Sequence, residues 1–166
     1  ELPFLSDSSE ILSVAWQRIY EQELLYLEEH KGTHLLGVFT HGPGQLWFNR
    51  KYEDLEDIKG LKVRIGGGIS QSSAKALSLV PLQAPVTKAY ELLSGGVADG
   101  IQLPGESISF FKLDRIIKQG FIFDGGLYNV SMFLVINKKK WNKLSQEDKV
   151  AINSVSGEFL AKMFED

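Results

Sequence analysis

The stretch DIKGLKVRIGGG, residues 57–68, decides the fold because it joins a glycine turn to an alternating strand and then to a glycine loop. Successive side chains of a strand point to opposite faces, so the apolar residues share one face while Lys62 and Arg64 share the other. Arg64 stands at the carboxyl end of this strand, where open α/β sheets bind ligands. Its planar guanidinium matches a carboxylate, which makes Arg64 the predicted anchor of an organic acid. The alternative is an arginine paired with a surface acid.

Helical and extended patterns alternate on both sides of this strand. We expect a first helix, capped by Asp7 or Ser8, and a last helix, opened by the capping box at 145–148 and turning Val150, Ile152, Val155, Phe159 and Met163 inward. The expected inner helices cover 70–79, 87–94 and 107–113, and the expected strands cover 34–39, 45–49, 61–65, 81–84, 98–103, 116–123 and 129–137. This alternation is typical of an α/β fold with a largely parallel sheet.

Composition excludes several function classes. The chain of 166 residues carries a net charge of -3, and its strongest basic run is Lys138-Lys139-Lys140, so nucleic acid is not an expected partner. It contains no cysteine, which removes thiol chemistry and zinc–thiolate sites. No apolar run approaches the roughly 20 residues of a membrane span, and no signal-like segment opens the chain.

Catalytic, cofactor and metal motifs are also missing from the sequence. The triple glycine completes neither G-x-G-x-x-G nor a P-loop, so no cofactor is expected. Gly32 interrupts the helix that would align His30 with His34, so no metal site is expected. G-x-S-x-G is absent, and nothing demands an enzyme.

The order of motifs resembles the DctP-type solute-binding proteins of tripartite ATP-independent periplasmic (TRAP) transporters. The resemblance rests on LPF at 2–4, DIKGLKVR at 57–64, AYELL at 89–93 with GVADG at 96–100, and FLVIN at 133–137 with Trp141 and Leu144 after it. It implies a periplasmic-binding-protein-like two-lobed fold and a periplasmic location. It also implies that the protein binds a small organic acid and delivers it to a TRAP membrane permease.

The resemblance further implies a division into lobes. Residues 1–40 and 127–166 would form the first lobe, and residues 41–126 the second lobe, which carries the carboxylate anchor. Family members are longer, so we expect a chain truncated at both ends with an incomplete first lobe. The apolar surface left exposed would favour a homodimer or the exchange of elements between chains.

Other ligand-binding residues follow from the same resemblance. With Arg64 they are His41, Gln45, Trp47, Gln102, Pro104, Glu106, Asn129 and Met132. Gly44 stands where some sialic-acid binders have a second arginine, and Gly105 stands where a related variant has tryptophan. The departure at Gly44 favours a smaller or more apolar acid, and the departure at Gly105 should enlarge or reshape the pocket. For Glu106, an alternative is an acid at a helix start that the backbone satisfies.

Two other functions compete with solute binding. A small α/β enzyme acting on an organic acid would need a base near Arg64. A fragment that binds nothing would show no response to organic acids in a thermal-shift experiment.

Overall fold

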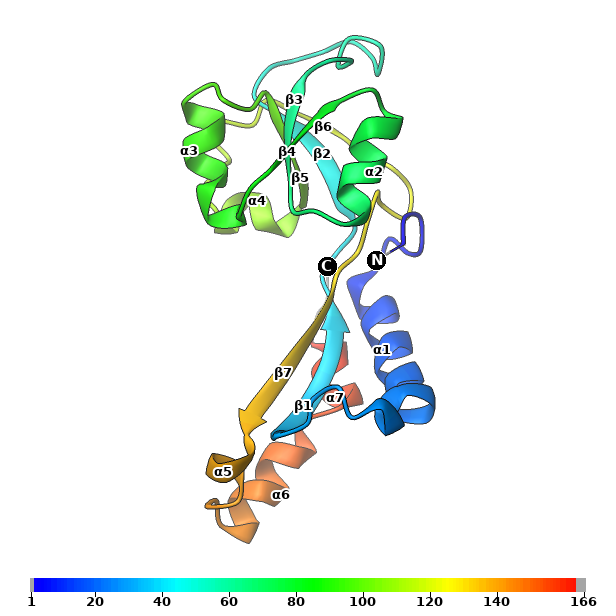
Figure 1. Cartoon of the computed structure of the whole chain (residues 1–166), viewed down its shortest axis with the longest axis vertical. Coiled ribbons are helices and arrows are strands. Elements are labelled where there is room, and N and C mark those ends of the chain that lie inside the picture. Colours follow the sequence, from blue (N-terminus) through cyan, green and yellow to red (C-terminus); the bar gives the residue numbers. More distant parts are fainter. Residues whose placement is uncertain (1, 164–166) are drawn as a thin grey trace. The chain divides into compact units, whose positions relative to one another are not determined.

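The computed structural model describes residues 2–163, which form two compact units (Figure 1). Unit 1 contains the described residues up to Asp7 together with Gly42–Asn129, and unit 2 contains Ser8–His41 together with the described residues from Val130 onward. The chain start packs within unit 1, where the Phe4 N–H donates to the Gly126 carbonyl at 2.8 Å. These boundaries differ from the expected ones at residues 2–7, at residue 41 and at residues 127–129. The assignment of the units to lobes of a binding protein stays a prediction.

Unit 1 is built on a five-stranded sheet with the order β4-β3-β5-β2-β6. Strand β3 is parallel to β4 and to β5, whereas β2 is antiparallel to β5 and to β6. The strands are β2 (Gly44–Phe48), β3 (Lys62–Ile65), β4 (Val80–Gln83), β5 (Gly100–Pro104) and β6 (Gln119–Phe121). The predicted α/β class is therefore confirmed, with β2 as the strand that runs against its neighbours.

Helices cover both faces of this sheet. Ile101 and Leu103 of β5 pack in one buried cluster with α3, α4 and the half-buried Trp47. Gln102 lies between them in the strand and so points to the other face, where it contacts Ser73 of α2. The helices are α2 (Ile69–Ala76), the 3₁₀ turn η3 (Val86–Lys88), α3 (Ala89–Ser94) and α4 (Glu106–Phe110). The sheet is thus buried between two helical layers, as parallel strands require.

Unit 2 is built on a two-stranded antiparallel sheet of β1 (Thr33–Thr40) and β7 (Ser131–Asn137). Its helical elements are α1 (Ser9–Ile19), the π-helical η1 (Tyr20–Leu24), the 3₁₀ turn η2 (Leu25–Leu27), α5 (Lys138–Trp141), α6 (Gln146–Ser154) and α7 (Glu158–Lys162). The expected caps are present, because the Ser8 hydroxyl accepts from the Ile11 N–H and the Ser145 hydroxyl accepts from the Asp148 N–H. No helix within residues 2–163 combines the length and apolarity of a membrane crossing.

The expected last helix is divided at Gly157. This residue adopts a φ of 61°, which favours glycine, and its N–H donates to the Leu36 carbonyl of β1 at 2.6 Å. The break anchors α7 to β1. The prediction that the apolar side chains of this helix point inward is wrong for four of five residues, because Val150, Val155, Phe159 and Met163 are 59%, 49%, 54% and 64% exposed. Ile152 is half-buried.

Helix α1 buries its polar side instead of its apolar one. The Ser13 hydroxyl accepts from the Thr40 N–H at 2.9 Å, and the Gln17 Oε1 accepts from the Val38 N–H at 2.8 Å. Both polar side chains are buried, whereas Ile11 is 67% exposed. Hydrogen bonds to β1 therefore determine which side of α1 faces the sheet.

Candidate functional site

Arg64 lies near the carboxyl end of β3, as the strand pattern predicts. The sheet register aligns it with Leu82 of β4 and Ile101 of β5, so its side chain leaves the sheet on the face that carries α3 and α4. Only 5% of Arg64 is exposed. The glycine loop that follows ends in α2, so the chain turns away immediately after the arginine.

The Arg64 guanidinium is held by a carbonyl and not by an acid. Its Nε and Nη2 donate to the Ala84 carbonyl at 2.8 and 2.6 Å, just beyond the end of β4. Within residues 2–163, no carboxylate lies at ion-pair distance from it. Burial lowers the pKa of Arg64 below its ordinary value, and the electrostatic interaction with Tyr128 partly offsets this effect. A buried cation held only by a carbonyl favours the approach of an anion.

Tyr128 fills the space above Gly44. A Cβ atom at Gly44 would lie 2.1 Å from the Tyr128 ring, which leaves no room for a side chain there. The Tyr128 hydroxyl donates to the Gln102 carbonyl at 3.3 Å. This hydrogen bond and the packing on Gly44 together hold the ring in place. An aromatic ring therefore occupies the space beside Gly44 in this chain.

Gln102 is completely buried, on the opposite face of the sheet from Arg64. Its amide exchanges hydrogen bonds with the Ser73 hydroxyl of α2, at 3.2 and 3.4 Å. The strand register therefore separates the side chains of Arg64 and Gln102, although their strands are neighbours. Gln102 fixes α2 to the sheet, and its binding role stays a prediction.

Gln45 and Trp47 have partners inside unit 1. The Gln45 amide clamps Phe123, donating to its carbonyl at 3.0 Å and accepting from its N–H at 2.8 Å. The Trp47 indole N–H donates to the Leu103 carbonyl at 2.7 Å, and its ring packs on Gly120. Both side chains thus have a structural task that sequence reasoning did not assign to them.

The remaining predicted residues are distributed over both units. In unit 1, Pro104 is buried at the end of β5, Asn129 is buried, and the exposed Glu106 accepts from the Gly42 N–H at 3.1 Å. This bond satisfies Glu106 with the backbone of another segment instead of its own helix. In unit 2, His41 and Met132 are half-buried. Their binding roles stay predictions.

Sequence reasoning missed Tyr128, Ala84 and Ser73. A carbonyl such as that of Ala84 has no sequence signal, because every residue carries one. The signal for Tyr128 is indirect: Gly44 lacks a side chain inside an otherwise bulky strand, which indicates that another side chain approaches closely.

Comparison with known proteins shows the family of the chain. The model of the DctP family, described as bacterial extracellular solute-binding protein, family 7, matches residues 1–166. The outer membrane transporter protein TsaT of Comamonas testosteroni is 28% identical over 164 residues, which are 98% of this chain and 48% of that protein. The chain spans about half the length of the curated relatives it matches.

Solved structures show the same fold. A TRAP periplasmic solute-binding protein of Bordetella bronchiseptica with bound (R)- and (S)-mandelate is 41% identical, with a TM-score of 0.85 over 99% of this chain and 52% of that one. A marine-metagenome TRAP solute-binding protein specific for aromatic acid ligands, in complex with 3-hydroxybenzoate, is 31% identical, with a TM-score of 0.85 over 98% of this chain and 51% of that one. The predicted family and fold are confirmed: this chain belongs to family 7 of the bacterial extracellular solute-binding proteins, the DctP family.

Proposed function

We propose that the protein binds an aromatic or similarly apolar monocarboxylate and that Arg64 anchors the carboxylate. The observation that carries this proposal is the buried guanidinium, whose Nε and Nη2 both bond the Ala84 carbonyl and which has no internal carboxylate among residues 2–163. Buried charges in proteins are normally paired. A ligand carboxylate would supply the missing negative charge in a bidentate geometry.

A single anchor and an aromatic neighbour favour a monocarboxylate. The Tyr128 ring occupies the space at Gly44 where a second arginine would stand, so a second carboxylate would lack a cation there. The two solved relatives bind mandelate and 3-hydroxybenzoate, which each carry one carboxylate on an aromatic body. We extend this class of acid to the present protein.

In this proposal Arg64 orients the bound acid and supplies only a part of the binding free energy. A hydrogen bond to a charged group stabilises a complex by about 1.5–3 kcal/mol, whereas micromolar binding requires about 8 kcal/mol. Apolar contact and exclusion of water must supply the rest. His41, Pro104, Asn129 and Met132 remain predicted contacts. The partners of Gln45, Trp47, Glu106 and Gln102 favour structural roles for these four.

Transport follows from binding in this proposal. The protein would act outside the cytoplasm, capture the acid without chemical turnover and deliver it to a TRAP-type membrane permease. The family and its solved members are solute-binding proteins, which supports a binding role over an enzymatic one. Dimerisation stays a prediction from the sequence.

Isothermal calorimetry with benzoate, (R)-mandelate, (S)-mandelate and L-malate tests the proposal. The wild-type chain should bind the aromatic acids more tightly than malate. Replacing Arg64 by methionine should weaken aromatic acid binding by about 10-fold or more, since it removes the charge-assisted bonds. The same substitution should leave the ligand-free protein at least as stable, because it removes a buried charge that no internal carboxylate pairs.

Arg50 offers a matched control, because it is an exposed arginine of the same unit. Arg50→Met should bind the acids as the wild-type protein does. Unchanged affinity in Arg64→Met, or an equal loss in both variants, would contradict the anchor. Release of a product from any of these acids would favour the enzyme hypothesis instead.

A further inference from the structure

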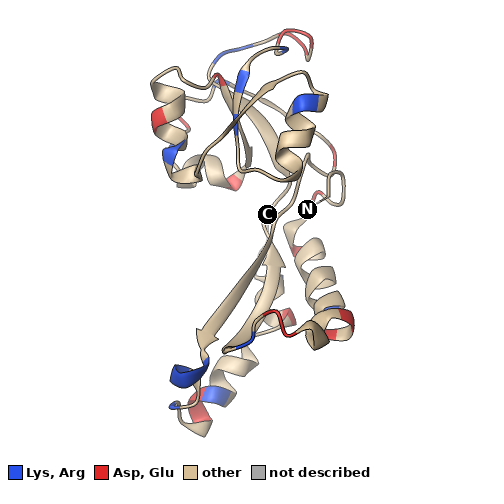
Figure 2. Ribbon diagram, viewed as in Figure 1, with Lys and Arg blue, Asp and Glu red and all other residues tan. Residues whose placement is uncertain are grey.

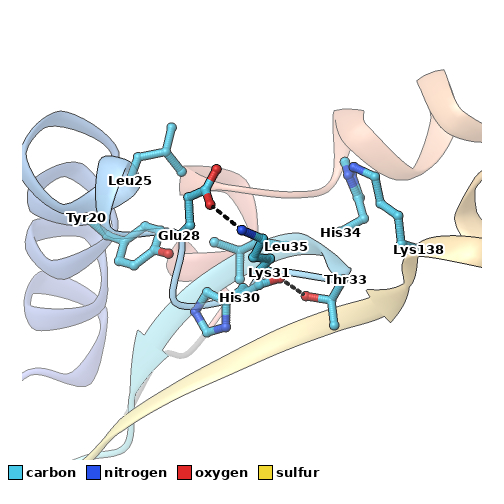
Figure 3. Close-up of a pocket in the computed structure, with 10 residues that line it drawn as sticks. Tyr20, Leu25, Glu28, His30, Lys31, Thr33, His34, Leu35 and Lys138 are labelled. Carbon is cyan, nitrogen blue, oxygen red and sulfur yellow. Dashed lines mark hydrogen bonds and ion pairs between the residues drawn. The ribbon is translucent and has the colours of Figure 1, made fainter.

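Unit 2 contains a pocket whose residues are remote in sequence from Arg64. Its volume is about 470 Å³, and it lies between the end of the first helical segment, the turn at 28–32, the start of β1 and the start of α5 (Figure 3). The residues that line it are Tyr20, Leu25, Glu28, His30, Lys31, Gly32, Thr33, His34, Leu35 and Lys138. Its volume lies within the range of small-molecule sites.

Basic groups outnumber acidic ones in this lining. The two lysines Lys31 and Lys138 are opposed by a single acid, Glu28, and His30 and His34 add two imidazole rings. The Glu28–Lys31 pair spans 3.3 Å with side chains 67% and 83% exposed, so water screens it and another anion can replace it at little cost. Lys138 has no carboxylate at ion-pair distance within residues 2–163. The pocket therefore carries positive charge, although the whole chain carries -3.

The imidazole of His34 is rigidly held. It stacks on Trp141 with ring centroids 3.6 Å apart and an interplanar angle of 10°, and its Nε2 lies 3.4 Å from the Asn153 Oδ1. Figure 3 shows the Lys138 and His34 side chains running in the same direction, to the same end of the pocket. A positioned imidazole beside a lysine lowers the ordering cost of binding an anion.

The opposite wall is aromatic and equally fixed. The His30 ring lies 5.7 Å from the ring of the buried Tyr20 and 4.7 Å from the ring of Phe133. The Thr33 hydroxyl donates to the His30 carbonyl at 2.7 Å and holds the turn in place. Leu25 and Leu35 add apolar surface. The lining thus combines a cationic end with a body of apolar and aromatic contacts.

Basic and apolar side chains also surround the pocket. Lys139 and Lys140 follow Lys138 on α5, which Figure 2 shows as a basic segment of unit 2. Tyr26 and Leu27 beside the lining are 78% and 49% exposed. Lysines next to exposed apolar and aromatic groups are typical of sites that hold an anionic head on an apolar body.

We infer that this pocket binds a phosphate group carried on a larger molecule. The ammonium group of Lys138, beside the His34 ring, would pair with the phosphate, and Lys31 adds a second positive charge to the lining. The remaining volume accepts the body of a phosphate monoester or of a lipid. Nothing in this inference depends on Arg64 or on the proposed acid. The two sources of phosphate share one recognition chemistry, and the experiment separates them.

Calorimetry with inorganic phosphate and glycerol 3-phosphate probes the soluble source. Co-sedimentation with vesicles of phosphatidylcholine, with and without phosphatidylglycerol, probes the lipid source. We expect binding in at least one of these two experiments. In that experiment Lys138→Ala should lower the affinity by about 10-fold, because it removes one charge-assisted contact. Binding to phosphatidylglycerol vesicles alone would assign the site to a lipid, and binding to the soluble probes alone would assign it to a soluble ester.

Lys143 is the matched control, because it is exposed in the same basic segment but does not line the pocket. Lys143→Ala should bind the phosphate probes as the wild-type protein does. Arg64→Met should also keep its affinity for the phosphate probes, although it should bind the aromatic acids more weakly. An equal loss in Lys138→Ala and Lys143→Ala would reduce the effect to general electrostatic attraction and overturn the site. Absence of binding in every arm would overturn it as well.

Discussion

The two units of the molecule protect their apolar side chains to different degrees. In unit 1, helices on both faces of the sheet leave Leu46, Phe48 and Ile101 completely buried. In unit 2, a two-stranded sheet and its helices leave Phe133 and Phe159 57% and 54% exposed. Unit 1 is therefore stabilised by apolar burial, whereas unit 2 depends more on hydrogen bonds such as those between α1 and β1. The variants below test this difference.

The largest effect should come from a phenylalanine in each unit. Phe48→Ala removes a fully buried ring and should lower the free energy of unfolding of unit 1 by about 3–5 kcal/mol. Phe159→Ala removes a ring that is 54% exposed and should cost about 1 kcal/mol or less. Urea unfolding followed by the indole N–H signals reports each unit, since Trp47 lies in unit 1 and Trp16 and Trp141 lie in unit 2. Equal losses of unfolding free energy in Phe48→Ala and Phe159→Ala would show that the two units do not differ in how much they depend on apolar burial.

A glycine in each unit tests how rigid the packing is. Gly44→Ala would place a methyl group 2.1 Å from the Tyr128 ring and should cost about 1–3 kcal/mol. Gly37→Ala would meet the Leu160 methyl group at 2.9 Å, and because this is the end of a flexible side chain the cost should be smaller.

A double-mutant cycle identifies the cause of the Gly44 effect. In a Tyr128→Ala background, Gly44→Ala should lose most of its cost, since the opposing ring is gone. If the cost persists in that background, the contact between Gly44 and Tyr128 is not its origin. Thermal unfolding of the four proteins provides the measurement.

Two positions of α1 test the role of hydrogen bonds in unit 2. Gln17→Ala leaves the buried Val38 N–H without its acceptor at 2.8 Å and should cost about 1–3 kcal/mol. Ile11→Ala, on the same helix but 67% exposed, should change stability by less than about 0.5 kcal/mol. If Ile11→Ala lowered the free energy of unfolding more than Gln17→Ala, α1 would pack through its apolar side, as an amphipathic helix usually does.

The smallest effect is a pH-dependent one at the Glu158 carboxylate. Hydrogen bonds from Arg18 and Lys162 lower the pKa of Glu158 from 4.5 to about 2. A depressed folded-state pKa stabilises the protein above the unfolded value, and this contribution is lost as the pH falls from about 4.5 to about 2. Glu158→Gln should therefore lower the melting temperature slightly at neutral pH and have no effect near pH 2. High salt should reduce the difference in melting temperature between the wild-type protein and Glu158→Gln, because the Arg18–Glu158 ion pair is solvent-exposed and is screened by salt.

Unit 1 could be predicted from the sequence to a large extent. Alternation in 61–65, the glycines at 66–68 and the helical pattern over 70–79 are local signals, and the structure has β3, α2 and β4 close to the expected bounds. The inward side of the last helix was predicted wrongly. Its periodicity indicates which residues share a side, but what covers that side depends on the rest of the fold.

The sequence by itself determined the α/β class, the family and the position of Arg64 at the end of a strand, because periodicity and motif order are local properties of the chain. Only the tertiary structure decided that Arg64 is buried against the Ala84 carbonyl and that Tyr128 closes the space over Gly44. It also decided that Gln102 turns to the opposite face from Arg64. These contacts join residues far apart in the chain, and their geometry depends on strand register and packing, which no local pattern encodes.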